Sequence, residues 1–329
     1  MTEADIAVIG GGPAGLAAAA AAYDTGVSNI LILERDPTLG GVLNQCTHKG
    51  FGGHIFGDVL DGPTFAKRCM KLVKDREIQY MLDTMVTELT PDLTMTAVNS
   101  RGLHKISARC VVLATGCRER GRGGLGIAGE RPAGILTAGT AQKLINTHDH
   151  LPGRDVVILG SGDIGLISAK LLTLRGARVK AVIERLPQSP GLDTNIDQCL
   201  NAFNTDLRLS HTVTRIVGRG RISGVYVAKV DENLQPIPVT EEFIPCDTLI
   251  LSVGLIPENE LASRAGVRLD TRTGGAVADE TFQTNLTGVF VCGNALRVHQ
   301  LVDYVYQEGQ LAGRHAAQYV LLGGTHAKA

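Results

Sequence analysis

The sequence lacks tryptophan, has few other aromatic residues and carries almost no net charge. Aromatic residues make up 4% of the 329 positions, and the formal net charge is -1. Surfaces that bind nucleic acid generally need a basic patch and aromatic side chains on which bases stack, so this composition predicts no nucleic-acid partner. Long apolar runs are also missing, since the run over residues 16–22 is far short of the roughly 20 residues that span a bilayer. We therefore expect no transmembrane segment.

The seven cysteines form no C-x-x-C pair, and their number is odd. They stand at positions 46, 69, 110, 117, 199, 246 and 292. Disulfide frameworks of secreted proteins use an even number of cysteines, so this set is typical of reduced thiols. The first five residues include two acids and lack the basic region of a signal peptide. These features predict a cytoplasmic protein, and the chain length favours two domains.

Glycine, by contrast, is abundant, with 40 residues, and it marks an internal repeat. Residues 6–34 and residues 156–184 each contain an apolar strand, a glycine turn, a helix and a second apolar strand that ends in glutamate. In both copies the glutamate follows the last glycine of the turn by 19 residues. Gly26 and Gly176 stand where the helices should end, as glycine commonly does at a helix C-terminus. The repeat predicts two βαβ units with parallel strands.

Each glycine turn has the pattern G-x-G-x-x-G, whose three glycines have different tasks. The first permits the tight turn, the second lets the backbone approach a pyrophosphate, and the third lets the helix pack closely on the strand. A phosphate at the helix start is stabilised by free N–H groups and the helix dipole, and the glutamate accepts hydrogen bonds from ribose hydroxyls. These residues are Gly10, Gly12, Gly15 and Glu34 in the first copy and Gly160, Gly162, Gly165 and Glu184 in the second. Two such copies predict two dinucleotide-binding sites.

Other segments complete an α/β pattern. Short alternating stretches within residues 78–110 predict an antiparallel flap, and residues 207–244 predict a meander of strands. Buried strands are expected at residues 110–114, 248–253 and 288–292, and a terminal helix at about residues 301–322.

Three further motifs accompany the repeat. Ala114-Thr115-Gly116 follows one buried strand, Gly254 follows another, and residues 287–293 read Thr-Gly-x-Phe-x-x-Gly. With the two dinucleotide units, these motifs resemble the FAD/NAD-linked pyridine nucleotide-disulfide oxidoreductases, and the length is similar to their short, thioredoxin-reductase-like branch. The resemblance implies an α/β fold with two Rossmann-like dinucleotide-binding domains. An NAD-binding domain over residues 118–254 would be inserted in a discontinuous FAD-binding domain, residues 1–117 and 255–329.

The resemblance also implies which residues bind the two cofactors, FAD and NAD(H). FAD would contact Gly10, Gly12, Pro13, Ala14, Gly15, Glu34, Arg35, Gly41, Val42, Val86, Ala114, Thr115, Gly116, Gly293, Asn294, Gln300 and Leu301. NAD would contact Gly160, Gly162, Asp163, Ile164, Gly165, Glu184, Arg185 and Gly254. Asn294 departs from the aspartate usual in the wider family, although its amide oxygen can still accept a hydrogen bond. Glu184 would repel a 2′-phosphate, which favours NADH over NADPH.

Disulfide reductases of this family carry a cysteine pair near the flavin, and this chain has none. Cys46 stands alone in that region, where it is either a packed thiol or a reactive thiolate. His48 and His54 lie in the same glycine-rich stretch and either transfer a proton near neutral pH or simply hydrogen-bond within a loop over the flavin. Cys46, His48 and His54 are thus the candidate catalytic residues, and His299 is a further candidate for contact with the flavin edge or a partner. Their spacing fits no strong zinc pattern, so we predict no metal site.

Finer motifs narrow the resemblance. Residues 114–120 and 131–141 are similar to the flavin subunits of amine and opine dehydrogenases. Residues 46–54 and 292–299 are similar to a bacterial group of FAD-dependent oxidoreductases associated with glycerol-3-phosphate-dehydrogenase-like partners.

These resemblances imply an FAD-dependent NAD(H) oxidoreductase in which hydride passes between nicotinamide and flavin. It would be an electron-transfer subunit for a small-metabolite dehydrogenase that acts on glycerol 3-phosphate, an amine or a hydroxy acid. Its partner would be a second dehydrogenase subunit, and a homo-oligomer is compatible with this role. Two alternatives are a self-sufficient NADH oxidase or quinone/dye reductase, and a non-catalytic protein with structural FAD.

Overall fold

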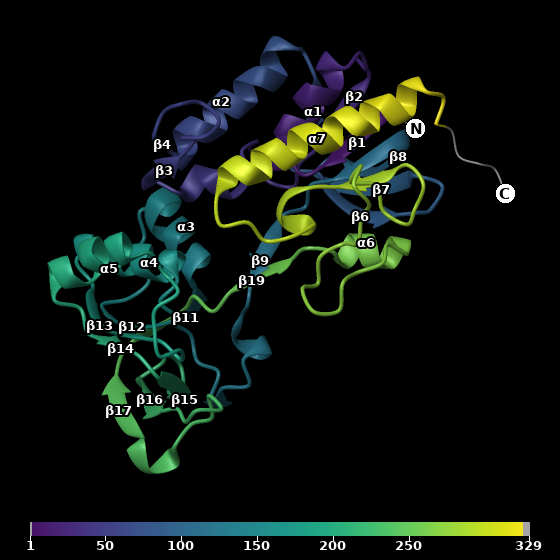
Figure 1. Ribbon diagram of the computed structural model, residues 1–329. Helices are drawn as coiled ribbons and strands as arrows, with labels where there is room; N and C mark the ends of the chain where they lie inside the picture. The colour runs from purple at the N-terminus through teal and green to yellow at the C-terminus, as the bar shows by residue number, and fades with distance from the viewer. Residues whose placement is uncertain (1, 325–329) are drawn as a thin grey trace. The chain divides into compact units, whose positions relative to one another are not determined.

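The computed structural model describes residues 2–324, and the chain divides into two compact units (Figure 1). The first unit contains residues 1–118 and 256–329, and the second contains residues 119–255. The chain passes between them through two short strands, β9 (Cys117–Glu119) and β19 (Leu255–Pro257), which pair with each other. Over the described residues, no helix combines the length and the apolar character that a membrane-spanning segment requires.

A seven-stranded sheet forms the centre of the first unit, in the order β5-β2-β1-β8-β7-β6, with β20 paired to β8. Its strands are β1 (Thr2–Ile9), β2 (Ile30–Leu33), β5 (Gln79–Met81), β6 (Met85–Leu89), β7 (Thr94–Asn99), β8 (Gly102–Leu113) and β20 (Val289–Val291). The early part of β8 pairs antiparallel with β7, whereas its later part pairs parallel with β1 and β20. The expected flap is therefore β6 and β7, which extend the parallel sheet. A separate pair, β3 (Lys49–Phe51) and β4 (Leu60–Asp61), lies outside it.

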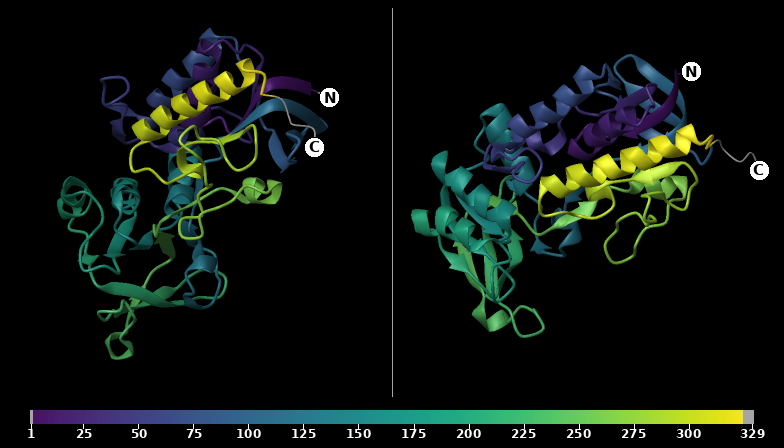
Figure 2. Two further views of the ribbon diagram at one scale, coloured as in Figure 1. Left: turned by 45° about the vertical axis from the view of Figure 1, so that its right-hand side comes forward. Right: turned by 45° about the horizontal axis from the view of Figure 1, so that its top comes forward.

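The two faces of this sheet pack against different partners, because successive side chains of a strand point to opposite faces. Ile6 and Val8 of β1 join a core with the helices α1 (Pro13–Asp24), α2 (Gly62–Asp75) and α7 (Val302–Leu321). Ala7 and Ile9 join a second core with the flap and α6 (Glu260–Ala265). The three long helices lie together as one layer (Figures 1 and 2).

Small residues let α1 and α7 approach closely. Residues 14–22 of α1 are all buried. Gly309 and Gly313 of α7 face this helix, where a Cβ atom would overlap the carbonyl oxygen of Ala14 or Ala18, respectively. The contact between the two helices is thus made through backbone atoms as well as side chains.

The second unit contains a parallel sheet, in the order β11-β18-β12-β13-β14, and a smaller sheet, in the order β10-β15-β16-β17. The strands are β10 (Ala128–Gly129), β11 (Ile135–Thr137), β12 (Asp155–Leu159), β13 (Arg178–Ile183), β14 (Leu207–Arg208), β15 (His211–Val217), β16 (Gly224–Lys229), β17 (Glu242–Pro245) and β18 (Thr248–Leu251). The helices are α3 (Ala138–His148), α4 (Asp163–Leu174) and α5 (Asp193–Cys199). The expected meander begins only at β15. Its predicted first residues form β14 instead, because the N–H groups of Val182 and Glu184 bond to carbonyls of residues 206 and 208.

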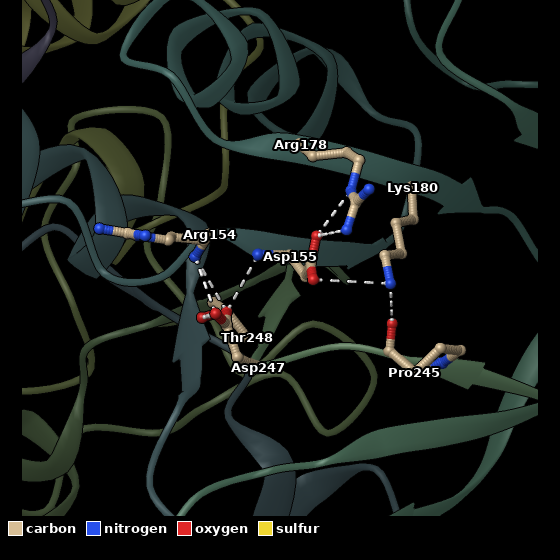
Figure 3. Close-up of polar contacts among 7 residues, drawn as sticks. All are labelled: Arg154, Asp155, Arg178, Lys180, Pro245, Asp247 and Thr248. Carbon is tan, nitrogen blue, oxygen red and sulfur yellow. Dashed lines mark hydrogen bonds and ion pairs between the residues drawn. The ribbon is translucent and has the colours of Figure 1, made fainter.

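Two carboxylates join neighbouring strands of the parallel sheet at the edge where β12 begins (Figure 3). Asp155 pairs with Arg178 and Lys180 on β13, and the hydrogen bond from Arg178 holds the pKa of Asp155 below its usual value. Asp247 accepts hydrogen bonds from the backbone N–H groups of Arg154 and Asp155. Ligands of parallel sheets bind at the opposite edge, where the strands end, so these contacts are structural.

The internal repeat extends to whole sheets. The order β5-β2-β1-β8-β20 in the first unit corresponds to β14-β13-β12-β18-β11 in the second. The last strand differs in origin, since β20 follows β8 near the end of the chain whereas β11 precedes β12. Gly26 and Gly176 end the two equivalent helices with φ values of +115° and +89°, as predicted. The predicted α/β fold with two Rossmann-like units is confirmed.

We expect Gly313→Ala to lower the free energy of unfolding by about 1–3 kcal/mol, the usual cost of overpacking. Alanine normally stabilises a helix relative to glycine by roughly 1 kcal/mol, so overlap with α1 reverses the ordinary sign. Thermal unfolding followed by far-UV circular dichroism should show a lower midpoint. Gln307→Ala, an exposed site on the same helix, is the control and should leave the midpoint unchanged. A Gly313→Ala protein as stable as its parent would contradict the close helix contact.

Candidate functional site

The glycine turn of the first unit lies between the end of β1 and the start of α1. Gly10 has a φ of +110°, and a Cβ atom there would overlap the carbonyl oxygen of Ala114 at the end of β8. A Cβ atom at Gly15 would overlap the carbonyl oxygen of Gly10. Only glycine fits these positions, which lets the first turn of the helix lie directly against the end of the strand.

The second unit repeats this arrangement at the end of β12. Gly160 has a φ of +104°, and a Cβ atom there would overlap the carbonyl oxygen of Ser252 at the end of β18. A Cβ atom at Gly165 would overlap the carbonyl oxygen of Gly160. In both turns, therefore, the first glycine contacts the end of a neighbouring strand, and the third glycine contacts the first.

The middle glycine of each turn faces open space instead. A Cβ atom at Gly162 would meet no atom within 4 Å, and one at Gly12 would meet only the Cα atom of Gly41, at 4.0 Å. Gly12 and Gly162 are also the N-caps of α1 and α4, and neither helix start has a side-chain cap. The two helix starts therefore adjoin open space, and the free N–H groups and the helix dipole favour an anion there.

A buried glutamate lies beside each turn, at the end of the adjacent strand. Glu34 Oε2 accepts a hydrogen bond from Gly11 N at 2.6 Å, and its Oε1 accepts one from Asp36 N at 2.8 Å. Glu184 Oε2 accepts hydrogen bonds from Ser161 N and Oγ, and its Oε1 accepts one from Leu186 N. Both glutamates are 6% exposed. A carboxylate has about four acceptor positions, so each can still bind ribose hydroxyls while orienting its turn.

The arginines that follow these glutamates are exposed, and one is held in place. Arg185 donates two hydrogen bonds from its guanidinium to the carbonyl oxygen of Leu234, at 3.0 and 2.7 Å. Arg35 lies exposed at the equivalent position of the first unit.

A second glycine pair supports the turn of the first unit. Gly40 N donates a hydrogen bond to Gly11 O at 2.8 Å, and a Cβ atom at Gly41 would lie 3.1 Å from the Cα atom of Gly12. Val42, the next residue, is 62% exposed. Gly41 and Val42, two of the predicted FAD contacts, thus lie beside the glycine turn.

The other predicted contacts are spread over both units. Thr115 Oγ1 donates a hydrogen bond to Glu258 O at 2.7 Å, and Gly116 O accepts one from Glu258 N. Val86 lies in β6 with its side chain buried in the core below the flap, so only its backbone is available to a ligand. In the second unit Ile164 and Gly254 are exposed.

Asp163, in the first turn of α4, is engaged within the second unit. Its carboxylate accepts hydrogen bonds from Leu192 N and from the side-chain amide of Asn195. It is therefore held by the start of α5, and its carboxylate positions that helix start against the start of α4.

The loop between β20 and α7 lies against the start of α1. A Cβ atom at Gly293 would lie 2.8 Å from the Cβ atom of Ala14. Asn294 accepts a hydrogen bond from His299 N at 3.0 Å and donates one to Cys117 Sγ at 3.4 Å. The amide oxygen expected to serve a ligand thus already orders this loop, with one lone pair remaining. Gln300 precedes Leu301, which is the N-cap of α7 and lacks a side-chain cap.

Two buried acids of α7 were not predicted from the sequence. Asp303 is 2% exposed and accepts hydrogen bonds from the backbone N–H groups of Gly52, His54 and Ile55. Glu308 is 4% exposed and contacts the loop that contains Gly293. Charged residues are seldom buried unless they are paired. An acid among the apolar positions of this helix was therefore the sequence signal that could have indicated a buried, hydrogen-bonded carboxylate.

The three candidate catalytic residues do not form a hydrogen-bonded group. Cys46 is half-buried and its thiol donates to Val42 O at 3.3 Å. Desolvation raises its pKa well above the usual value, to about 11. His48 contacts Lys49 O at 3.1 Å. His54 stacks on Tyr304, with ring centroids 6.2 Å apart. The raised pKa favours the packed thiol over the thiolate for Cys46.

All seven cysteines lie within the described residues, and none of them is in a disulfide. Cys69, Cys110 and Cys292 are buried, and desolvation raises the pKa of each. Within residues 2–324, no three His, Cys, Asp or Glu side chains are grouped as a metal site would need.

Comparison with known proteins gives consistent relatives. The family model described as pyridine nucleotide-disulphide oxidoreductase matches residues 4–315. Thioredoxin reductase of Listeria monocytogenes is 27% identical over 96% of this chain and 93% of that protein. An opine oxidase subunit of Agrobacterium tumefaciens is 25% identical over 95% of this chain and 64% of that protein. The crystal structure of T. acidophilum thioredoxin reductase has a TM-score of 0.79 at 21% identity, covering 98% of this chain and 100% of that one.

We predict that Cys46 reacts slowly with iodoacetamide at neutral pH, because only the thiolate attacks and its pKa is about 11. The alkylation rate, followed at this residue by peptide mass spectrometry, should keep rising up to about pH 10. An unfolded peptide with the same residues should instead level off above its ordinary pKa of about 8.5. A plateau near neutral pH in the folded protein would identify Cys46 as a reactive thiolate.

Proposed function

This chain belongs to the pyridine nucleotide-disulphide oxidoreductase family, and from that premise we propose that its first unit binds FAD and its second binds NAD(H). The chain is thus a flavin-dependent pyridine nucleotide oxidoreductase. When bound, the flavin and the nicotinamide supply the hydride-transfer chemistry. The protein contributes binding, orientation and electrostatics, and these follow from the geometry of its two glycine turns.

We propose that the first unit holds FAD through backbone groups. The N–H groups at Gly12 and the start of α1 would bind the pyrophosphate, and Glu34 would bind the adenosine ribose. The segments around Gly41 and Gly293 adjoin the same turn and would hold the flavin half. The uncapped start of α7, at Leu301, would stabilise negative charge on the flavin through its free N–H groups.

The second unit has the same cradle, which supports its assignment to NAD(H). Gly162 and the start of α4 would bind the pyrophosphate, and Glu184 would bind the ribose. Glu184 is buried and its hydrogen bonds hold its carboxylate toward the turn. A 2′-phosphate would meet this negative charge, so we propose NADH as the preferred nucleotide.

We further propose that the chain is an electron-transfer subunit for a small-metabolite dehydrogenase. The observation that carries this proposal is the spacing of the cysteines, which contain no C-x-x-C pair, and none of the seven is in a disulfide in the described residues. Without a C-x-x-C dithiol to relay electrons to a protein disulfide, we propose that electrons pass directly between the flavin and a docked partner. The similarity to an opine oxidase subunit, which by its name works within a larger enzyme, supports the same role.

Native purification with mass spectrometry, followed by reconstitution, tests the partner. NADH should reduce the isolated chain and an artificial dye should reoxidise it, whereas glycerol 3-phosphate, amino acids and hydroxy acids alone should leave it oxidised. Adding the co-purified protein should couple metabolite oxidation to reduction of this flavin. Rapid reduction of the single chain by one of these metabolites would contradict the partner model, and rapid turnover with oxygen or quinone would favour a self-sufficient oxidase or reductase.

Glu184→Gln should weaken the preference for NADH about tenfold, equivalent to about 1.4 kcal/mol, because the charge facing the 2′-phosphate is removed. Anaerobic stopped-flow measurement of flavin bleaching with each nucleotide gives the ratio of rates.

Glu34→Gln is the matched control, since both glutamates accept bonds from the backbone of their turn and from the residue two positions on. It should weaken FAD retention without changing the nucleotide ratio. A parent protein that is reduced faster by NADPH would refute the assignment of Glu184.

A further inference from the structure

A buried carboxylate of α7 joins three parts of the loop that precedes this helix. Glu308 Oε2 accepts hydrogen bonds from Gly293 N at 2.8 Å and from His299 Nε2 at 3.0 Å. Glu308 Oε1 accepts one from the guanidinium of Arg297 at 2.5 Å. Over residues 2–324, His299 is the one histidine whose ring lies within ion-pair distance of a carboxylate.

These contacts determine which nitrogen of His299 carries a proton. An ionised carboxylate only accepts hydrogen bonds, so the proton between the two groups belongs to Nε2. The neutral ring then has its lone pair on Nδ1. Glu308 therefore presents the basic nitrogen of His299 on the side away from itself.

Nδ1 of His299 remains able to bind a proton. No hydrogen bond to this atom occurs in the part of the chain that the structure describes, and it is not among the fully buried polar atoms without a partner. The side chain is 14% exposed, which leaves a route to water. Arg297 also pairs with Glu308, through the other carboxylate oxygen.

Other ionisable groups face this imidazole from the elements around it. On α7, Asp303 is committed to three backbone N–H groups, and the Tyr304 ring lies 6.4 Å from the His299 ring. His54 lies beyond Tyr304, in the loop held by Asp303. On β9, the Cys117 thiol reaches the same loop through Asn294. None of these groups forms an ion pair with His299 within the described residues.

We infer that His299 binds the proton that accompanies reduction of the cofactor, and that Glu308 is its positioning residue. This inference rests on the proposed placement of the flavin beside Gly293 and Asn294. A hydride from NADH carries two electrons and one proton, leaves NAD⁺ behind, and adds one negative charge to the first unit. One proton from water, bound at Nδ1 of His299, offsets that charge. When the two electrons leave, this proton and the one that arrived with the hydride both return to water.

The experiment measures protons rather than turnover. The holoprotein is reduced anaerobically with light and a deazaflavin donor at neutral pH, and a pH indicator reports the protons taken up per two electrons, after subtraction of the donor reaction without protein. His299→Gln should take up fewer protons than the parent. Glu308→Gln keeps an acceptor for His299 Nε2 but removes the charge, so it should also take up fewer. His104→Gln, a histidine of β8 whose ring hydrogen-bonds to the side chain of Asn99 rather than to a carboxylate, should match the parent.

Nitrogen NMR of ring-labelled histidine in the apoprotein provides a second measurement. The His299 signals, identified by their loss in His299→Gln, should show the proton on Nε2, and adding FAD should shift them. Absence of that shift would contradict the flavin placement. A clear shift together with equal proton uptake in the parent and His299→Gln would overturn the proton role and leave the proposed function standing.

Discussion

In both units, two glycines are in direct contact where a strand ends and a helix begins. The carbonyl oxygen of the first glycine occupies the space that a Cβ atom on the second would need. Gly10 and Gly15 form this contact in the first unit, and Gly160 and Gly165 form it in the second. Because the helix start lies so close to the strand, a carboxylate on the neighbouring strand reaches the backbone of the turn. The steric contact thus places the free N–H groups and a buried carboxylate on one edge of each sheet.

The sequence predicted this much because the determinants are local. Three glycines, a helix and a glutamate lie within about 30 residues of each other, so their spacing alone encodes the geometry. The glycines at the ends of the two helices were predictable for the same reason, as were the apolar strands buried on both faces. The extent of the parallel sheet was harder, because two-residue strands such as β14 have too little periodicity to separate them from a following meander.

The partners of the buried acids of α7 could not be predicted, because they are distant in sequence or depend on a folded loop. Asp303 bonds to residues about 250 positions earlier, and Glu308 meets His299 only because the intervening chain turns back on the helix. Asn294 shows the same limit, since its amide is used within the loop as well as being suited to a ligand. The residue type at each of these positions shows which hydrogen bonds its side chain can form. Only the tertiary structure shows which partners it forms them with.

The insertion of one unit within the other also affects the order in which the protein can be assembled during translation. The second unit is one continuous stretch, whereas the first needs segments from both sides of it. On the ribosome the inserted unit can complete its core before β20 and α7 have been made. Until then the alanine face of α1 lacks its covering helix, and such exposed apolar surface invites aggregation. Gly309 and Gly313 therefore belong to the segment that closes the first core last, and damage there would act on the yield of folded protein before it acted on chemistry.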